Sequence, residues 1–261
     1  MTAHWNAADY HQQSSAQAIW AHELIAKLAL RGHEHLLDIG CGTGRITALF
    51  AEQLPEGIVV GIDSSADMIT FAQDEYTQPN LRFVHMPAQA LDLDDTFDVV
   101  FSNAVLHWVH DHEAVLRGMR RHIQPGGSVL LQMGGQGNAQ AVVEIFNAVI
   151  ARPAWRAYFA DFAFPYAFYG PDQYTDWLPA TGFTAQRIEL IPKTMTHTLD
   201  GLKGWLRTTW FPYTDCVPAD QRDTLIDQVA TAYLAAHPVN DQGQAEVAMV
   251  RLEVEARADG H

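Results

Sequence analysis

The residues with the clearest chemical potential form a glycine-rich segment near the start of the chain. Residues 37–45 read LDIGCGTGR and lie between an apolar run and a predicted helix. Glycine lets a backbone turn tightly and approach a ligand with no Cβ in the way. About 20 residues further on, a second apolar run ends in Asp63, whose carboxylate can accept hydrogen bonds from both hydroxyls of a ribose. This spacing indicates a nucleoside site at one edge of a parallel sheet.

Two classes of cofactor use such a loop, and the glycine spacing separates them. A dinucleotide fingerprint has the pattern G-x-G-x-x-G, in which the third glycine lets the helix pack on the sheet. Here Gly40, Gly42 and Gly44 place the third glycine one position early. Asp38 would repel a pyrophosphate, whereas it could help to fix the ammonium group of an amino acid. Both departures favour S-adenosylmethionine, a nucleoside with an amino-acid tail, over NAD.

The first 133 residues alternate between helical and strand patterns, which predicts an α/β fold with a parallel sheet. Strands are expected at 35–40, 58–63, 81–86, 97–101 and 128–133, and helices at 15–30, 44–54, 64–76 and 112–123. Ser64 and Asp67 have capping-box spacing, so Ser64 is expected to start its helix. The Pro-Gly-Gly at 125–127 is expected to end the helix that precedes the fifth strand.

The second half of the chain has a different pattern. Strands near 183–195 and 245–257 would complete the sheet. A substrate lid over the sheet edge would be formed by two segments, near 134–180 and 199–240. Their pattern is mainly helical and partly rich in aromatic residues. We therefore expect a cofactor-binding core over 1–133, with an N-terminal cap helix, and sheet completion with the lid over 134–261.

The composition limits the class of partner. The chain has 261 residues, of which 48% are apolar, and 16 Lys and Arg against 31 Asp and Glu give a net charge of −15. Such a charge argues against nucleic acid and anionic membrane as partners. A membrane span is not expected, because the sequence has no run of about 18 consecutive apolar residues. Two cysteines and no signal-peptide pattern indicate a cytoplasmic protein. The 13 histidines are scattered, so no metal is expected. The expected state is a monomer or homodimer.

Four segments together resemble class I S-adenosylmethionine-dependent methyltransferases. LDIGCGTG at 37–44 resembles that family's first motif, and Asp63 with Ser64 and Met68 resembles its second. FDVVFSN at 97–103 resembles the fourth-strand motif, and QPGG at 124–127 resembles the turn before strand five. The resemblance covers about residues 34–133. It implies a Rossmann-like seven-stranded mixed sheet with helices on both faces and an antiparallel last strand.

The resemblance implies a role in cofactor binding for each matching residue. Gly40, Gly42 and Gly44 would line the methionine part, with Asp38 bracing the loop, while Asp63 with Ser64 would hold the ribose, Met68 would pack on adenine, and Asn103 would present its backbone near the ammonium group. The family often has an acidic residue near adenine where this chain has Pro87. The backbone N–H of Ala88 or the amide of Gln89 is expected to replace it.

Shorter motifs resemble two groups that methylate carboxylates of small molecules. Tyr10, SSAQ at 14–17 and LHWV at 106–109 resemble juvenile hormone acid methyltransferases, while WN at 5–6, NAVLHWV at 103–109 and GWLR at 204–207 resemble trans-aconitate methyltransferases. By this resemblance Tyr10 would contact the cofactor, and Gln17 would reach the acceptor carboxylate or the cofactor. Trp108 would form a wall beside the sulfonium, where an aromatic face stabilises a cation. Arg207 is a candidate carboxylate clamp.

The expected reaction is methyl transfer to the carboxylate of a small organic acid, with S-adenosylhomocysteine as the other product. A carboxylate is nucleophilic at neutral pH and needs no general base. The alternative is a C-, N- or phenol O-methyltransferase, which would need a base such as His107, His110 or Tyr169. Trp205 and Trp210 are further substrate candidates, with lid packing as the other interpretation. A nucleotide-binding module without catalysis and an NAD-dependent dehydrogenase also stay open.

Overall fold

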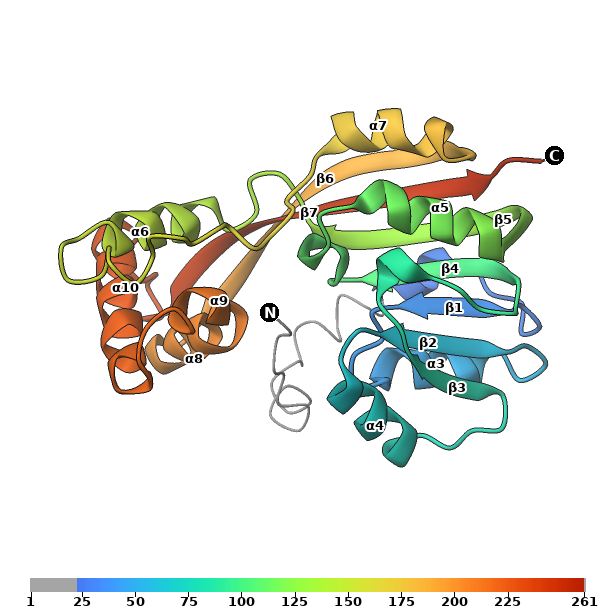
Figure 1. Cartoon of the computed structure of the whole chain (residues 1–261), viewed down its shortest axis with the longest axis horizontal. Helices are drawn as coiled ribbons and strands as arrows, with labels where there is room; N and C mark the ends of the chain where they lie inside the picture. Colours follow the sequence, from blue (N-terminus) through green and yellow to red (C-terminus); the bar gives the residue numbers. More distant parts are fainter. Residues whose placement is uncertain (1–22, 261) are drawn as a thin grey trace. The chain divides into compact units, whose positions relative to one another are not determined.

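Seven strands form one mixed sheet in the computed structural model, which describes residues 23–260 (Figure 1). The strands are β1 (Leu36–Ile39), β2 (Val59–Asp63), β3 (Leu81–His85), β4 (Phe97–Asn103), β5 (Ile123–Gly134), β6 (Phe183–His197) and β7 (Ala245–Ala258). They lie in the order β3-β2-β1-β4-β5-β7-β6. The neighbouring pairs from β3 to β5 are parallel, whereas the arrow of β7 points opposite to that of β1. The expected α/β fold class is confirmed.

Helices and short helical turns connect these strands. In chain order they are α3 (Arg45–Gln53), α4 (Ala66–Glu75), η1 (Ala88–Ala90), η2 (Leu106–Trp108), α5 (His112–His122), α6 (Gln140–Ile150), α7 (Pro171–Ala180), α8 (Leu199–Thr209), α9 (Phe211–Thr214), η3 (Ala219–Gln221) and α10 (Arg222–Ala236). Residues 23–27 are also helical. They are the described part of the helix expected at 15–30, whose remaining residues mostly lie outside the described range.

The parallel strands are buried on both faces because successive side chains alternate between two hydrophobic clusters. Leu37 and Val60 belong to a cluster that includes residues of α5 and α7. Leu36 and Val59 belong to a second cluster that includes Phe50 of α3 and part of residues 23–27. This alternation explains why the strands appear in the sequence as short apolar runs, and it directs Asp38 toward α3.

Ser65, and not the expected Ser64, is the N-cap of α4. The Ser65 hydroxyl accepts the backbone N–H of Met68 at 3.4 Å. The Ser64 carbonyl instead lies 2.9 Å from Nε2 of His85. The expectation was wrong by one residue because the chain bends at Ser64, and Ser65, with φ −95° and ψ 115°, directly precedes the first helical residue, Ala66.

We expected the Pro-Gly-Gly at 125–127 to separate helix from strand, but the segment lies inside β5. Helix α5 ends at His122 and strand β5 begins at Ile123. Phe97 pairs with Ile123 and Val99 with Ser128, so β5 has several extra residues opposite β4. These residues form a bulge-like irregularity inside the strand, where Gly126 adopts φ 76°.

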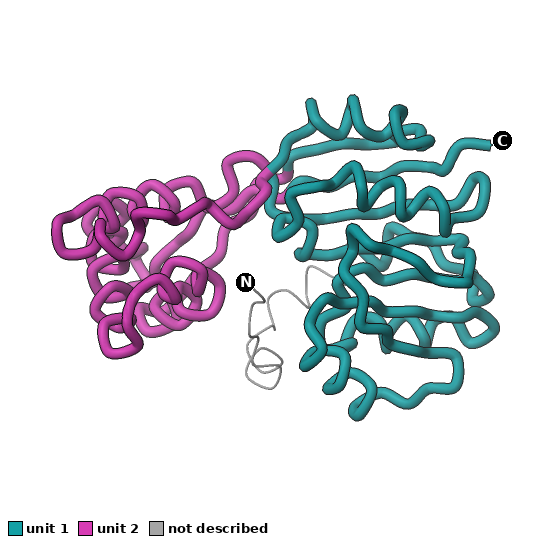
Figure 2. The backbone as a smooth tube through the Cα atoms, in the orientation of Figure 1, with its two compact units in different colours: residues 1–135, 169–190, 252–261 teal, residues 136–168, 191–251 magenta. Residues whose placement is uncertain are grey.

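The chain divides into two units (Figure 2). Unit 1 holds the residues up to Gly135, Tyr169–Leu190 and the residues from Leu252 onward, and unit 2 holds Gln136–Phe168 and Ile191–Arg251. The expected domain division at residue 133 stays a prediction, and in this structure α7 packs on α5 and lies in unit 1. The function of the helical segments as a lid stays a prediction.

Unit 2 contains α6, α8, α9 and α10 and has its own aromatic core. The Tyr213 ring lies 4.3 Å from the Phe146 ring, measured between centroids, and the Trp210 ring lies 5.7 Å from it. All three side chains are buried. Aromatic pairs of this kind stabilise a core beyond the area they bury, so this cluster accounts for how α6 and the α8–α9 segment pack together.

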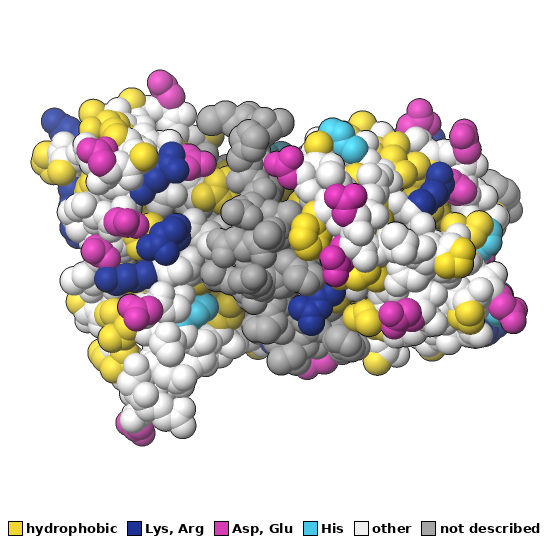
Figure 3. Space-filling view, turned by 90° about the horizontal axis from the view of Figure 1, so that it is seen from below, with side chains coloured by type: hydrophobic (Ala, Val, Ile, Leu, Met, Phe, Trp, Pro, Cys, Tyr) yellow, Lys and Arg dark blue, Asp and Glu magenta, His cyan; other side chains and the backbone are white. Residues whose placement is uncertain are grey.

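Within residues 23–260, no helix combines the length and apolar character needed to cross a membrane. The same residues contain no group of three or more His, Cys, Asp or Glu placed to hold a metal ion. On the described surface visible in Figure 3, acidic and basic side chains are interspersed.

Candidate functional site

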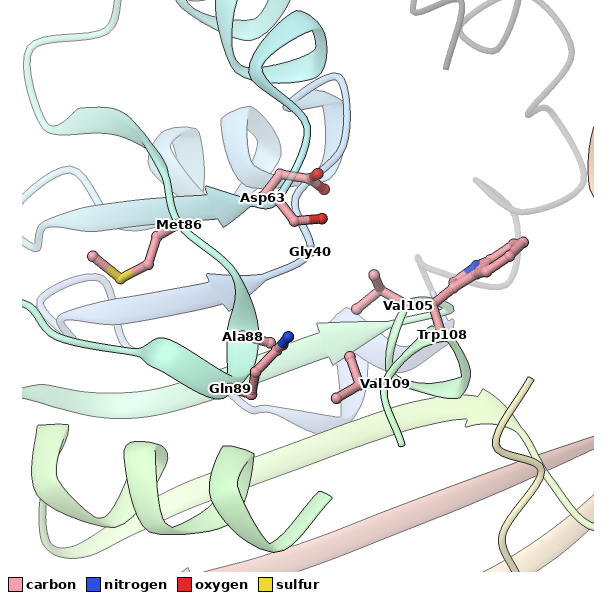
Figure 4. Close-up of a pocket in the computed structure, with 9 residues that line it drawn as sticks. Gly40, Asp63, Met86, Ala88, Gln89, Val105, Trp108 and Val109 are labelled. Carbon is pink, nitrogen blue, oxygen red and sulfur yellow. The ribbon is translucent and has the colours of Figure 1, made fainter. Parts of the chain in front are cut away.

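A cavity of about 130 Å³ lies at the carboxyl ends of β1, β2 and β4 in unit 1 (Figure 4). Its lining residues are Gly40, Asp63, Ser64, Met86, Ala88, Gln89, Val105, Trp108 and Val109. Open α/β sheets bind their ligands beyond the carboxyl ends of the strands. The cavity is therefore where the fold predicts a small-molecule site.

The glycine loop forms one wall of this cavity. Gly40 has φ 77°, and a Cβ on it would lie 2.2 Å from Cγ1 of Val105, so only glycine fits between the ends of β1 and β4. Gly44 has φ 80°, and a Cβ there would lie 2.6 Å from the ring of Phe83. Gly42 has φ 54°, and no atom of the described part of the chain lies within 4 Å of a Cβ added there. Gly40 thus permits close packing at the cavity, and Gly44 permits it behind the loop.

Asp63 holds the loop in place with part of its hydrogen-bonding capacity. Its Oδ2 accepts the backbone N–H of Gly42 at 3.0 Å, and its Oδ1 accepts that of Ser65 at 2.8 Å. Burial raises the pKa of Asp63, and the two N–H donors oppose this rise. A carboxylate has about four lone-pair sites. The carboxylate can therefore hold the loop and still accept hydroxyl groups of a ligand in the cavity.

Asp38 lies on the side of the loop away from the cavity. Its side chain is 3% exposed, and its Oδ2 accepts the hydroxyl of Thr47 at 2.7 Å. Burial raises the pKa of Asp38 to about 7, although the Thr47 hydrogen bond opposes the rise. The contact ties β1 to α3 beneath the glycines. Binding of a ligand's ammonium group by Asp38 stays a prediction.

The turn after β4 forms the opposite wall. Ala104 has the left-handed φ of 58° and donates its N–H to the carbonyl of Gln132 at 2.7 Å. The turn then presents Val105, Trp108 and Val109, which Figure 4 shows on the side away from Met86. Left-handed backbone at a non-glycine residue is strained and is often found beside ligands.

The structure brings together a large part of the predicted cofactor site. Six of the predicted residues line the cavity, namely Gly40, Asp63, Ser64, Ala88, Gln89 and Trp108. Met68 is buried in α4 and Asn103 ends β4, and neither lines it. Tyr10 and Gln17 lie outside the described residues.

Three apolar lining residues were not predicted. They are Met86, Val105 and Val109. The two valines lie inside the NAVLHWV segment, and Met86 directly precedes Pro87. Their position in these segments was the only sequence signal that they could line the site. Their placement around the cavity, such as that of Val105 against Gly40, depends on the folded sheet.

The substrate candidates of unit 1 already have polar partners. His107 Nδ1 accepts the backbone N–H of Gly134 at 3.3 Å. The Tyr169 hydroxyl donates to the carbonyl of His110 at 2.8 Å. Neither residue lines the cavity.

The other substrate candidates belong to unit 2. Arg207 forms an exposed ion pair with Asp223 at 3.3 Å. Trp205 stacks on His197 with ring centroids 5.3 Å apart, and Trp210 is buried with no hydrogen-bond partner for its Nε1 among the residues that the structure describes. Their participation in an acceptor site stays a prediction.

The class I methyltransferase fold is defined by a parallel sheet extended by an antiparallel strand, with a glycine loop after β1 and an acid at the end of β2. Residues 37–131 match the family model described as a methyltransferase domain. An uncharacterized methyltransferase of Schizosaccharomyces pombe is 32% identical over 216 residues, which cover 78% of this chain and 80% of that protein. The chain belongs to the family of S-adenosylmethionine-dependent methyltransferases.

Other relatives carry a more specific name. A trans-aconitate 2-methyltransferase of Methylobacterium nodulans is 27% identical over 260 residues, covering 98% of both chains. One of Deinococcus radiodurans is 39% identical over 129 residues, covering 49% of each chain. The chain is similar to both.

Solved structures share the fold at low sequence identity. The YcgJ protein of Bacillus subtilis has a TM-score of 0.61 and 16% identity, covering 94% of this chain and all of that one. Mycolic acid cyclopropane synthase CmaA1, solved with S-adenosylhomocysteine, has a TM-score of 0.60 and 14% identity, covering 94% of this chain and 85% of that one. At such identities the likeness is one of fold alone.

Proposed function

We propose that the protein transfers a methyl group from S-adenosylmethionine to a carboxylate oxygen of a small organic acid. The observation that carries the cofactor part is the cavity in which the Gly40 backbone and the Asp63 carboxylate face one space. The acceptor part is supported by relatives named trans-aconitate 2-methyltransferase, one of which aligns over 98% of both chains.

The cavity residues fit the three parts of this cofactor. Asp63 would accept the ribose hydroxyls, because its carboxylate lines the cavity. Met86, Ala88 and Gln89 would surround the adenine, with an apolar surface from Met86 and an amide from Gln89. Gly40, which has no side chain between the loop and Val105, would lie against the methionine part.

When bound, the cofactor supplies a methyl group on a positively charged sulfur. The protein's contribution is alignment of the acceptor and exclusion of water. Val105, Trp108 and Val109 would provide this on one side of the cavity, with the Trp108 ring available to stabilise a cation. None of these three side chains can act as a general base. A carboxylate acceptor needs none, because it attacks without losing a proton.

The contacts of two candidate bases also favour a carboxylate acceptor. Since His107 Nδ1 accepts a backbone N–H, a proton on that nitrogen would break the bond to Gly134. The Tyr169 hydroxyl donates a hydrogen bond to the His110 carbonyl. A phenol or carbon acid would need such a group free to take a proton.

Calorimetry with S-adenosylhomocysteine tests the cofactor part. We expect the wild type to bind and Asp63→Ala to lose at least about tenfold in affinity, the value of one hydrogen bond to a charged group. Asp74→Ala is the matched control, because it removes an exposed carboxylate from α4 outside the cavity. Absence of binding by the wild type, or equal affinity in the Asp63 variant, contradicts the proposal.

Turnover tests the acceptor part. The protein with S-adenosylmethionine is offered trans-aconitate, a fatty acid and a terpenoid acid, and in parallel a phenol and an amine. Detection of a methyl ester by mass spectrometry is the expected result. Methylation of the phenol or amine, with none of the acids, would establish the C-, N- or phenol O-methyltransferase alternative.

A further inference from the structure

The turn that carries Trp108 is held through its first carbonyl group. Leu106 begins η2, and its carbonyl accepts the N–H of Val109 at 2.9 Å. The same carbonyl lies 2.8 Å from Nε2 of His112. Because Val105, Trp108 and Val109 surround this carbonyl in the chain and line the cavity, whatever fixes it also fixes one wall of the site.

His112 is buried at the start of α5, with 1% of its surface exposed. Its second ring nitrogen, Nδ1, lies 2.8 Å from the hydroxyl of Tyr174 on α7. A carbonyl can only accept, so Nε2 of His112 must carry the proton and donate it to Leu106. In the neutral ring, Nδ1 is then an acceptor, and the hydroxyl of Tyr174 must donate to it. Both ring nitrogens thus have one fixed function.

The surroundings keep this ring neutral and in one orientation. Burial lowers the pKa of His112, while the bond to the Leu106 carbonyl raises it, and the nearby charges of His110 and Asp111 act in opposite directions. The rings of Tyr169 and Trp177 lie 4.8 and 5.7 Å from the imidazole, measured between centroids. These rings restrict rotation of the imidazole, and the backbone of Val109 is a second hydrogen-bonding contact that raises the pKa of His112.

We propose that His112 is a positioning residue, which transmits the placement of Tyr174 on α7 to the Leu106 carbonyl and so holds Trp108 and its two valine neighbours against the cofactor. Tyr174 and Leu106 are 68 positions apart in the sequence, and His112 joins them through two hydrogen bonds. The arrangement makes α7 a support of the cavity, although no residue of α7 lines it.

Two substitutions of His112 separate its two hydrogen bonds. The amide nitrogen of glutamine reaches about as far as Nε2 of histidine, so His112→Gln keeps a donor for the Leu106 carbonyl. The side chain of asparagine is shorter, so His112→Asn can meet Tyr174 but leaves that carbonyl without its side-chain donor. His122→Asn is the matched control, because His122 is a second buried histidine of α5, bonded to Gly118 and Leu93 at the far end of the helix.

The measurements are the affinity for S-adenosylhomocysteine and the fluorine NMR signal of Trp108 in protein labelled with 5-fluorotryptophan, assigned with Trp108→Phe. For His112→Asn we expect a shifted signal and an affinity reduced about tenfold, as for one lost buried hydrogen bond. His112→Gln keeps the donor for the Leu106 carbonyl but loses the bond to Tyr174, so it should restore the affinity to within about threefold of the wild-type value and reverse most of the signal shift. His122→Asn should lower the melting temperature and leave both readouts unchanged.

Three results would overturn the inference. The first is an unchanged Trp108 signal and affinity in His112→Asn. The second is an equal loss in His122→Asn, which would indicate general loosening of α5. The third is a failure of His112→Gln to restore the signal.

A second variant covers the case in which His112→Asn does not fold. Tyr174→Phe removes only the hydroxyl, which donates to Nδ1 of His112 at 2.8 Å and also lies 3.5 Å from Sδ of Met133. It should shift the Trp108 signal and weaken binding by about threefold, within the range for one neutral hydrogen bond. An unshifted signal would count against the inference.

The inference depends on the cofactor part of the proposed function, and the two can fail separately. A wild type that does not bind S-adenosylhomocysteine contradicts the proposed cofactor. A wild type that binds, with a His112→Asn variant that binds equally well, contradicts only the positioning function. The identity of the acceptor affects neither readout.

Discussion

Replacement of Gly40 by alanine tests whether close approach between two strand ends builds the cavity. A Cβ on Gly40 would lie 2.2 Å from Cγ1 and 2.5 Å from Cβ of Val105, and φ at this position is 77°. Both distances are shorter than two non-bonded carbon atoms can approach each other. Gly40→Ala must therefore displace the turn that carries Val105, or the glycine loop, or both.

The structure separates two contributions to the cost. A left-handed φ costs an alanine about 1–2 kcal/mol, and forcing a methyl group into filled space costs about 1–3 kcal/mol more. Gly42→Ala is the matched control, since Gly42 has φ 54° and no atom of residues 23–260 lies within 4 Å of the added Cβ. At about 2–4 °C per kcal/mol for a chain of this size, we expect Gly40→Ala to lower the melting temperature by about 10 °C and Gly42→Ala by about 4 °C.

Thermal melting and calorimetry with S-adenosylhomocysteine check this prediction together. Because the displaced residues line the cavity, Gly40→Ala should also lose at least about tenfold in affinity, which corresponds to about 1.4 kcal/mol. Adding Val105→Gly removes the overlapping atoms and should recover part of the stability, whereas Val105→Ala keeps the Cβ at 2.5 Å and should not. Equal melting temperatures and equal affinities for the Gly40 and Gly42 variants would refute the reasoning.

Two further predictions concern charged groups. Because burial raises the pKa of Asp38 to about 7 from 3.8, its folded form holds the proton more tightly, so stability is lost as pH rises between these values. Asp38→Asn should therefore raise the melting temperature at pH 8 by more than at pH 4, as thermal melts across this range would show. Arg207 pairs with Asp223 on the surface, 56% and 82% exposed, so Arg207→Ala should change stability by no more than about 1 kcal/mol. If Arg207 binds the acceptor, the same variant should raise KM for the acid in steady-state kinetics.

The core of unit 1 was predictable because its signals are local. Each parallel strand is a short apolar run; the glycine loop directly follows β1, and Asp63 is the last residue of β2. The choice between Ser64 and Ser65 as N-cap was not predictable, since adjacent serines differ only in the direction of the chain as it leaves β2. The Pro-Gly-Gly segment likewise has the composition of a turn, and only its pairing with β4 makes it part of a strand.

The contacts that shape the cavity were harder to predict because they join distant segments. Val105 meets Gly40 only after β1 and β4 have paired in parallel register. Tyr174 meets His112 only because α7 packs on α5 within unit 1. The segment of α7 was expected to belong to the lid at 134–180, because its sequence pattern does not indicate the unit in which it packs.

The distribution of backbone strain is consistent with the location of the site. Gly40 and Ala104 stand at the ends of the neighbouring strands β1 and β4, and both have a positive φ, of 77° and 58°. Glycine adopts this conformation without cost, but Ala104 adopts it at the expense of about 1–2 kcal/mol. Such strain persists only where surrounding contacts impose it. The Gln132 carbonyl and the His112 bond to Leu106 supply those contacts, so the support of the turn and the shape of the cavity have the same physical origin.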